Sequence, residues 1–500
     1  MPTEELIENI RPRGFSAALT PSWPVLVGLA ALARALFDRR ELLNDPDTYL
    51  HIAAGRWMLA HAALPSLDPF SHSMAGAPWV VHEWLSEVIL ALTYDASGWS
   101  GLALLTAACF AASMALMAHA LLPRLGTLVT LIVVTLGVAL VLPHLLARPH
   151  ILALPLLVIW SASLIGARDA GGAPPLRVLP LMTLWANLHG SFMFGVALAL
   201  FAGAEAAFGA ESRGRRSTEI RRWGVFTLLA AVAAVITPNG VAGLLLPFHL
   251  TQMGVLENSF GEWLSPNFHT FQPLEVWFLG MMFIGFSLGL KLPVSRLLLL
   301  LGLIHMALRN ERHADLLAMV GPIAVAASLG PALLARLRPT EAPALERTLE
   351  SAAPPGGKPA LLMALGLVLA LGISTLVYPL RRSDDRVTPE AALAAATRLG
   401  LSGPVLNDEP FGGYLVFRGV PTFIDGRVEM YGESFLRRYL DAVGGDETAL
   451  IGLLQEYSIT WTLLDPQGGV ARTLEHLSGW RRVYADAYAV IYARSDALPR

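Results

Sequence analysis

The segment SGWSGLALLTAACFAASMALMAHALL, residues 97–122, decides what kind of fold this chain can have. As a helix it is long enough to cross the hydrocarbon core of a bilayer, and it contains no Asp, Glu, Lys or Arg. Similar apolar blocks recur through residues 22–380. Over all 500 residues, 54% are hydrophobic and only 15% are charged, against about 25% charged in soluble proteins. The sequence therefore predicts a polytopic α-helical membrane protein.

Charged residues are unevenly distributed along the chain. Asp, Glu, Lys and Arg make up 29 of the last 120 residues but only 46 of the first 380. We therefore predict a cytoplasmic N-terminal tail at 1–21, a transmembrane domain at 22–380 and a soluble domain at 381–500. The single cysteine, Cys109, excludes an intrachain disulfide. The net charge of −3 gives no reason to expect a nucleic-acid partner.

The apolar blocks predict eleven transmembrane spans and one further helix, at 84–95, that lies along the membrane interface. The spans are expected at 22–38, 97–122, 126–143, 150–167, 174–187, 190–210, 223–245, 272–290, 294–309, 313–335 and 359–380. Arginines gather in the even-numbered connections, most densely at 213–222. The positive-inside rule then places the N-terminus in the cytoplasm. Because the number of spans is odd, the domain at 381–500 is expected on the extracytoplasmic, periplasmic side.

Most polar residues of chemical interest fall in the external connections. Ionisable groups near membrane depth are costly, so such residues are candidates for function. Six connections contribute them to one face, which predicts a polar cavity that opens outward. The candidate site residues are Asp45, Asp47, His51, His82, Glu83, Arg148, His150, Asn187, His189, Glu262, Trp263, Arg309 and Arg312.

The longest external connection, at 39–96, is too apolar for a flexible tether, and prolines punctuate it. We therefore expect a structured loop with a functional role. Asp45 has a plain structural explanation as the cap of a helix that begins at Pro46, but a cap explains Asp47 less well. Alternatively, the two carboxylates supply a general base, or bind a divalent cation with His51, which lies one turn beyond Asp47.

Two runs in this loop resemble a known enzyme superfamily. The runs DPDTYLHIAAGRWMLAHAALPSLDPFS (45–71) and PWVVHEWLSEV (78–88) are similar to the first external loop of GT-C-type glycosyltransferases. That superfamily includes protein O-mannosyltransferases, lipid A aminoarabinose transferases and oligosaccharyltransferases. The chain most resembles a set of bacterial membrane proteins that share six of its motifs. These are D-x-D-x-x-x-H at 45–51, HEWL at 82–85, RPH at 148–150, WANLHG at 185–190, GGYL at 412–415 and DGR at 425–427.

The resemblance implies a GT-C-like fold in the bacterial inner membrane and a donor sugar carried on a polyprenyl phosphate. It implies Asp47 as general base, with the pattern D-x(8)-R-x-M ahead of Arg56 and Met58, and Asp45 as the second choice. Arg148, Arg309 and Arg312 become candidates for the donor phosphate, because guanidinium groups fit phosphate oxygens. The sugar or acceptor is assigned to His51, His82, Glu83, His150, Asn187, His189, Glu262 and Trp263.

Each of these assignments has a structural alternative. External arginines at helix ends also snorkel towards water. Asn187 and His189 also satisfy backbone groups where two helices meet. Trp263 is also typical of a membrane-interface anchor.

Residues 386–500 alternate helix-like and strand-like runs, which predicts a small α/β domain with a mixed sheet. Strands are expected at 403–407, 413–417, 421–425 and 459–464, followed by two at the C-terminal end; helices are expected at 388–400, 433–443, 447–457 and 470–478. Asn407 and the DGR run at 425–427 fall at predicted strand ends, where ligands often bind. They form either an acceptor-binding surface or a structural turn network in which Asp425 pairs with Arg427.

The leading functional hypothesis is a glycosyltransferase that uses a lipid-linked sugar and an envelope acceptor outside the membrane. A transporter or flippase is an alternative, and it predicts an inverted repeat and polar groups near the middle of the membrane. A non-catalytic envelope scaffold is the third. The sequence contains no P-loop, dinucleotide fingerprint, zinc-type spacing or G-x-S-x-G motif.

Overall fold

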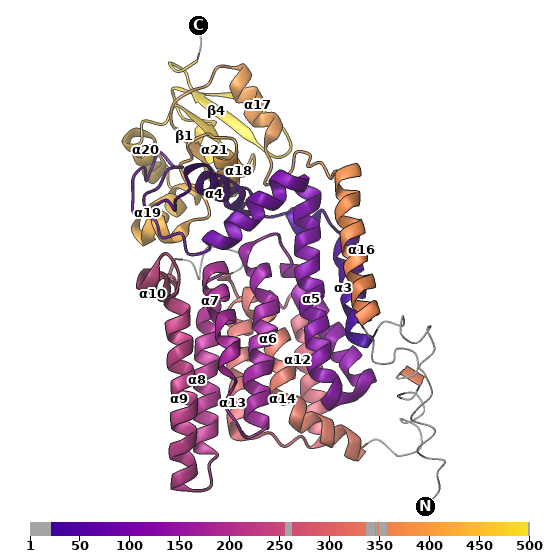
Figure 1. Ribbon diagram of the computed structural model, residues 1–500. Coiled ribbons are helices and arrows are strands. Elements are labelled where there is room, and N and C mark those ends of the chain that lie inside the picture. The colour runs from indigo at the N-terminus through magenta and orange to yellow at the C-terminus, as the bar shows by residue number, and fades with distance from the viewer. Residues whose placement is uncertain (1–21, 256–262, 337–345, 347, 350–357, 499–500) are drawn as a thin grey trace, which may run out of the picture.

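The structure is a computed structural model, and it describes residues 22–255, 263–336, 346, 348–349 and 358–498. A bundle of helices carries a smaller α/β domain at one end (Figure 1). The helices of the bundle are α3 (Trp23–Phe37), α5 (Trp84–Val141), α6 (Pro149–Asp169), α7 (Leu179–Leu188), α8 (Phe192–Phe208), α9 (Arg213–Val235), α10 (Gly240–Thr251), α12 (Pro273–Leu288), α13 (Val294–Arg309), α14 (Ala314–Arg336) and α16 (Lys358–Val377).

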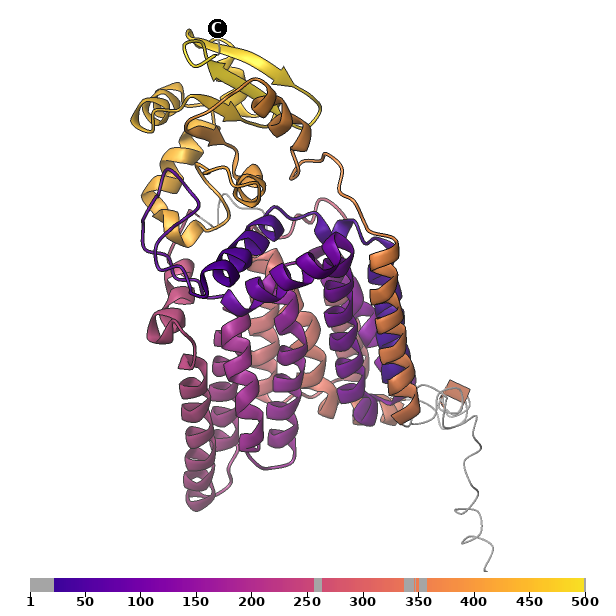
Figure 2. The same ribbon diagram turned by 45° about the horizontal axis from the view of Figure 1, so that its top comes forward.

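Two glycines divide α5 into three segments. Gly98 and Gly126 have φ of 59° and 71°, in the left-handed region that favours glycine. The first segment and α4 (Asp47–His61) lie across the end of the bundle (Figure 2), as the interfacial helix at 84–95 was expected to do. After Gly126, the Glu346 carboxylate accepts hydrogen bonds from the backbone N–H groups of Thr127 and Leu128 and so caps the restarted helix.

Three helices in the described part of the chain are each long and apolar enough to cross a membrane. They cover Trp84–His144, Pro149–Asp169 and Glu311–Leu333, and five shorter apolar helices accompany them. The span expected at 223–245 is broken: α9 ends at Val235 and the chain bends by 106° into α10. Pro238 disfavours helical geometry at the residue before it, and Gly240 has a φ of 52°, so the break is local in origin. The arginines at 213–222 belong to α9 rather than to a loop.

The α/β domain contains a mixed four-stranded sheet in the order β1-β2-β4-β3. β1 and β2 are parallel, and β4 pairs antiparallel with both β2 and β3. The elements are α17 (Glu390–Arg398), β1 (Val405–Asn407), α18 (Glu409–Phe417), α19 (Val428–Val443), α20 (Glu447–Glu456), β2 (Trp461–Leu463), α21 (Gly469–Leu474), β3 (Trp480–Ala485) and β4 (Val490–Arg494).

Two expected strands of this domain do not form. The run GYLVF at 413–417 is the second half of α18. A short apolar run that is buried on all sides lacks the alternation of polar and apolar residues that distinguishes a strand from a helix. Pro410 in the first turn of α18 favours the helix. The run PTFID at 421–425 makes one bridge, between Thr422 and Ser71, because its neighbour is the loop after α4 rather than the sheet.

The loop at 39–96 and the α/β domain share one hydrophobic core. Met58, Trp79 and Val81 of the loop are buried in the same cluster as Phe423 and Tyr431. A separate core fills the bundle. Because apolar burial is the main favourable term in folding, this shared core fixes the domain on the loop that carries Asp45 and Asp47.

A buried ion cluster joins three helices of the bundle near their ends away from the α/β domain (Figure 1). The Arg296 side chain on α13 is only 5% exposed, and it bonds Asp169 Oδ1 of α6 at 3.0 Å and Glu205 Oε1 of α8 at 2.9 Å. Arg124 and Arg168 approach the same two carboxylates less closely, at 3.5 and 3.9 Å. Arg296 thereby ties α13 to α6 and α8.

Replacing Arg296 with Leu should lower the free energy of unfolding by about 3 kcal/mol, because it leaves two carboxylates without their closest cation. Thermal unfolding of the purified protein in detergent measures this. Arg215→Leu is the matched control, because the Arg215 side chain is 65% exposed and its ion pair spans 4.0 Å; its effect should stay below about 1 kcal/mol. Equal effects of the two substitutions would contradict a structural role for the Arg296 cluster.

Candidate functional site

A cavity of about 580 Å³ opens at the end of the bundle that carries the α/β domain. Its walls come from the connections that precede α5, α6, α8 and α14, together with the end of α13. Eight of the predicted site residues line it: His82, Glu83, Arg148, His150, His189, Trp263, Arg309 and Arg312. The predicted gathering of polar residues from separate connections into one cavity is therefore present. Glu262 lies outside the described residues.

Glu83 is the carboxylate at the centre of the histidines in this cavity. Its Oε1 lies 3.3 Å from His189 Nε2 and 3.6 Å from His82 Nε2. Burial opposes ionisation of Glu83, but His82, His189, His51 and Arg148 outweigh it and hold its pKa at about 2. Glu83 is therefore an anion at neutral pH. Burial, together with Arg312, His82 and Arg148, lowers the pKa of His189 to about 4 despite the nearby Glu83, so we assign His189 as the neutral partner.

The arginines of the cavity come from separate parts of the chain. Arg148 immediately precedes α6, while Arg309 ends α13 and Arg312 lies in the short helix η6 (Glu311–His313). The Arg312 guanidinium stacks 4.6 Å from the centre of the Trp263 ring. Backbone and side-chain hydrogen bonds tie the segment 263–265 to 309–311. These hydrogen bonds hold Arg309, Arg312 and the Trp263 ring on one wall of the cavity. Trp263 therefore has a role besides anchoring in the membrane interface.

Asp45 and Asp47 lie beside the cavity and are linked to it by Arg148. The Arg148 guanidinium is 2.8 Å from Asp47 Oδ2 and 3.4 Å from Asp45 Oδ2. Asp45 Oδ1 also accepts a hydrogen bond from the backbone N–H of Asp47 at 2.8 Å, which is the capping role expected for it. The Asp47 side chain keeps 15% exposure against 5% for Asp45. Asp47 is therefore the more accessible carboxylate, although neither residue lines the cavity wall.

Comparison with solved structures places this arrangement in a known fold. The chain is similar to the crystal structure of ArnT from Cupriavidus metallidurans in the apo state, with a TM-score of 0.50. The match covers 95% of this chain and 98% of that chain, at 13% sequence identity. The chain therefore has an ArnT-like fold. No protein-family profile matches the sequence, and no curated protein sequence is similar to it at a significant level.

Two predicted site residues make contacts that join helices of this fold. His51 Nδ1 lies 3.2 Å from Glu87 Oε1, so its ring faces α5 and not the Asp45–Asp47 pair. The Asn187 side chain accepts a hydrogen bond from Trp84 and donates to the Thr183 and Ile236 carbonyls, so it joins α7 to its neighbours. Their positions in the sequence did not reveal which way these side chains point.

The proposed metal set of Asp45, Asp47 and His51 does not come together. The two aspartates face Arg148, whereas His51 pairs with Glu87. Among the described residues, no group of three or more His, Cys, Asp or Glu side chains is arranged to hold a metal ion. We therefore assign no divalent cation to these residues.

Six further polar residues that line the cavity lie outside the candidate set: His144, Ser191, His305, Asn310, His313 and Asp315. Ser191 Oγ lies 2.8 Å from His189 Nδ1. Each of the six is within four residues of a predicted one in the sequence. For His305 the helix spacing was the available signal, because it precedes Arg309 by four residues in α13 and residues four apart share a helix face.

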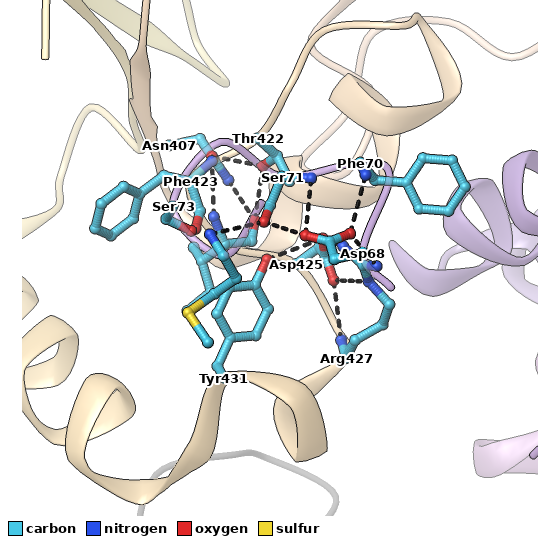
Figure 3. Close-up of polar contacts among 12 residues, drawn as sticks. Asp68, Phe70, Ser71, Ser73, Asn407, Thr422, Phe423, Asp425, Arg427 and Tyr431 are labelled. Atoms are coloured by element: carbon cyan, nitrogen blue, oxygen red, sulfur yellow. Dashed lines mark hydrogen bonds and ion pairs between the residues drawn. The ribbon is translucent and has the colours of Figure 1, made fainter. Parts of the chain in front are cut away.

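The DGR motif at 425–427 forms a buried turn network that joins the α/β domain to the loop (Figure 3). Arg427 donates to both carboxylate oxygens of Asp425, at 2.8 and 2.7 Å, and to Asp68 Oδ1 at 2.6 Å. Tyr431 donates to Asp425 at 3.0 Å. The Arg427 guanidinium also packs 4.7 Å from the Trp79 ring centre. Of the two interpretations drawn from the sequence, the structural turn network describes this geometry.

Arg427→Met should destabilise the docked domain by about 3–5 kcal/mol, because it leaves Asp68 and Asp425 buried without their cation. Hydrogen exchange of the segments 68–79 and 422–431 measures local opening. Arg437→Met serves as the control, since the Arg437 side chain is 61% exposed and pairs only with Glu433 on its own helix. Unchanged exchange in the Arg427 variant would show that the network does not hold the domain in place.

Proposed function

We propose that the protein is a membrane glycosyltransferase of the bacterial inner membrane. It moves a sugar from a polyprenyl-phosphate-linked donor to an envelope acceptor on the outer face. The observation that carries this proposal is the convergence of Arg148, Arg309 and Arg312 in one cavity at a single end of an apolar bundle. The GT-C-type fold supports the same class of reaction.

The arginines suit the needs of a phosphate leaving group. In the proposed reaction, an acceptor oxygen attacks the anomeric carbon and the bond from that carbon to the phosphate oxygen breaks. The electron pair of the broken bond stays on the polyprenyl phosphate. Guanidinium groups stabilise this developing charge through charge-assisted hydrogen bonds, which are stronger in a cavity shielded from water. The stacking of Arg312 on Trp263 pre-organises one of these groups.

Asp47 is the proposed general base that takes the acceptor proton. It is the more accessible aspartate, and it shares the Arg148 guanidinium with the cavity. A donor phosphate that engages Arg148 competes with Asp47 for this guanidinium. Weakening that ion pair leaves the carboxylate available to an acceptor hydroxyl or amine. Glu83 is the anion in the cavity wall, and we assign it to orient His82, His189 and the sugar hydroxyls.

A transporter or flippase fits the geometry less well. That function predicts polar groups near the middle of the membrane. The described cavity instead takes its polar residues from connections at one end of the bundle. A scaffold likewise has no need for three arginines that face one cavity. We therefore keep the transferase as the proposed function.

Asp47→Asn should abolish transfer, because an amide cannot accept the acceptor proton. In cells, the variant should reproduce the deletion: a glycan is lost and a polyprenyl-phosphate sugar accumulates in the glycolipid mass spectrum. Asp441→Asn, at an exposed position of the α/β domain, is the control expected to match wild type. If deletion alters the glycans while Asp47→Asn does not, Asp47 is not the base. If deletion changes neither glycans nor glycolipids, the proposed function fails.

Arg309→Gln and Arg312→Gln should each weaken binding of a polyprenyl phosphate to the purified protein about 10-fold or more. The loss of a hydrogen bond to a charged group, typically about 1.5–3 kcal/mol, sets this expectation. Titration with undecaprenyl phosphate in detergent measures the affinity. Arg215→Gln removes one positive charge from α9 and controls for net charge. Equal affinity in all variants would place the phosphate elsewhere.

A further inference from the structure

The backbone of the α/β domain lies directly on the turn that carries Asp45 and Asp47. A Cβ atom added at Gly426 would come closer than 3.0 Å to Asp47 Oδ1, and one added at Gly413 would come equally close to the Pro46 carbonyl oxygen. Real Cβ atoms do not approach other atoms this closely. The glycines of the GGYL and DGR motifs therefore permit a contact between this domain and the Asp47 turn that no other residue allows.

The backbone at Gly426 is held firmly on both sides. Asp425 and Arg427 flank it, and both belong to the buried network with Asp68 and Tyr431 (Figure 3). The Gly412 position also has no room for a side chain, because it packs on the Ile424 carbonyl and on Asp425. The two motifs therefore support one another, and the surface that they present to Asp47 is rigid.

We propose that the α/β domain completes the active site: Gly426 positions the Asp47 carboxylate against Arg148, and Gly413 packs on the Pro46 backbone that precedes it. Both are positioning residues, because they act through Asp47 and not on the substrate. This inference rests on the proposed function, since it concerns the same base. It extends that function by giving the soluble domain a direct part in the reaction rather than a role in holding the acceptor alone.

Gly426→Ala tests whether Gly426 positions the Asp47 carboxylate. The added methyl group must displace Asp47 or the turn, and a displacement of about 1 Å in a reacting group costs about 100-fold in rate. The probe is the envelope fraction of deletion cells, which contains both the accumulated polyprenyl-phosphate sugar and the unmodified acceptor. The measurement is consumption of that donor by purified full-length protein. We expect a loss of about 100-fold in kcat with donor affinity retained. Gly452→Ala is the control, because no atom lies within 4 Å of a Cβ at that position.

Gly413→Ala is the second variant. The added methyl group would meet the Pro46 carbonyl oxygen, so it should shift the start of α4, which carries Asp47. We expect kcat to fall while donor affinity is retained, as in Gly426→Ala. A purely structural role would not separate kcat from donor affinity in this way.

The outcomes separate this inference from the proposed function. Wild-type activity of Asp47→Asn would remove the base itself and the proposed mechanism with it. Loss of activity in Asp47→Asn together with wild-type behaviour of Gly426→Ala and Gly413→Ala would overturn only the role of the α/β domain. If Gly426→Ala does not fold, the kcat and donor affinity of Gly413→Ala decide alone.

Discussion

The ion pairs of Arg148 with Asp45 and Asp47 are the contacts on which the site depends. One guanidinium lines the cavity and also binds the turn that opens the loop at 39–96. Its position at the start of α6 aims it across the end of the bundle, and Asp45 accepts a hydrogen bond from the Asp47 backbone N–H. The cavity and the Asp47 carboxylate are thereby linked through one side chain, so an anion bound to Arg148 would alter the charge around Asp47.

The α/β domain stabilises this arrangement from the other side. Its core is continuous with that of the loop, and its Arg427 pairs with Asp68 of the loop. Its Gly413 packs on the Pro46 backbone and its Gly426 on the Asp47 carboxylate. The domain and the loop therefore behave as one folded unit on the bundle. Conformational freedom of Asp47 is low in such a unit, which favours catalysis because less entropy is lost when reactants are oriented.

The sequence predicted the cavity well because its residues follow from topology. Alternating spans bring every second connection to one face, so Arg148, His189 and Arg309 meet whatever the details of packing. Side-chain direction could not be predicted in this way: His51 and Asn187 belong to the same segments but face other helices. The helix at 413–417 and the bend after Val235 were missed because both depend on tertiary neighbours and local turn geometry rather than on apolar content. The glycine contacts with Asp47 involve pairs more than 360 residues apart, which no local pattern reveals.

The most direct test of the central claim is a cryo-EM structure of the full-length protein with undecaprenyl phosphate. The account predicts phosphate density in the cavity within hydrogen-bond distance of Arg148 and at least one of Arg309 and Arg312, with the Arg148–Asp47 distance longer than the 2.8 Å found here. Phosphate density outside the cavity, or inside it with the Arg148–Asp47 pair intact and no contact to the arginines, would contradict the account.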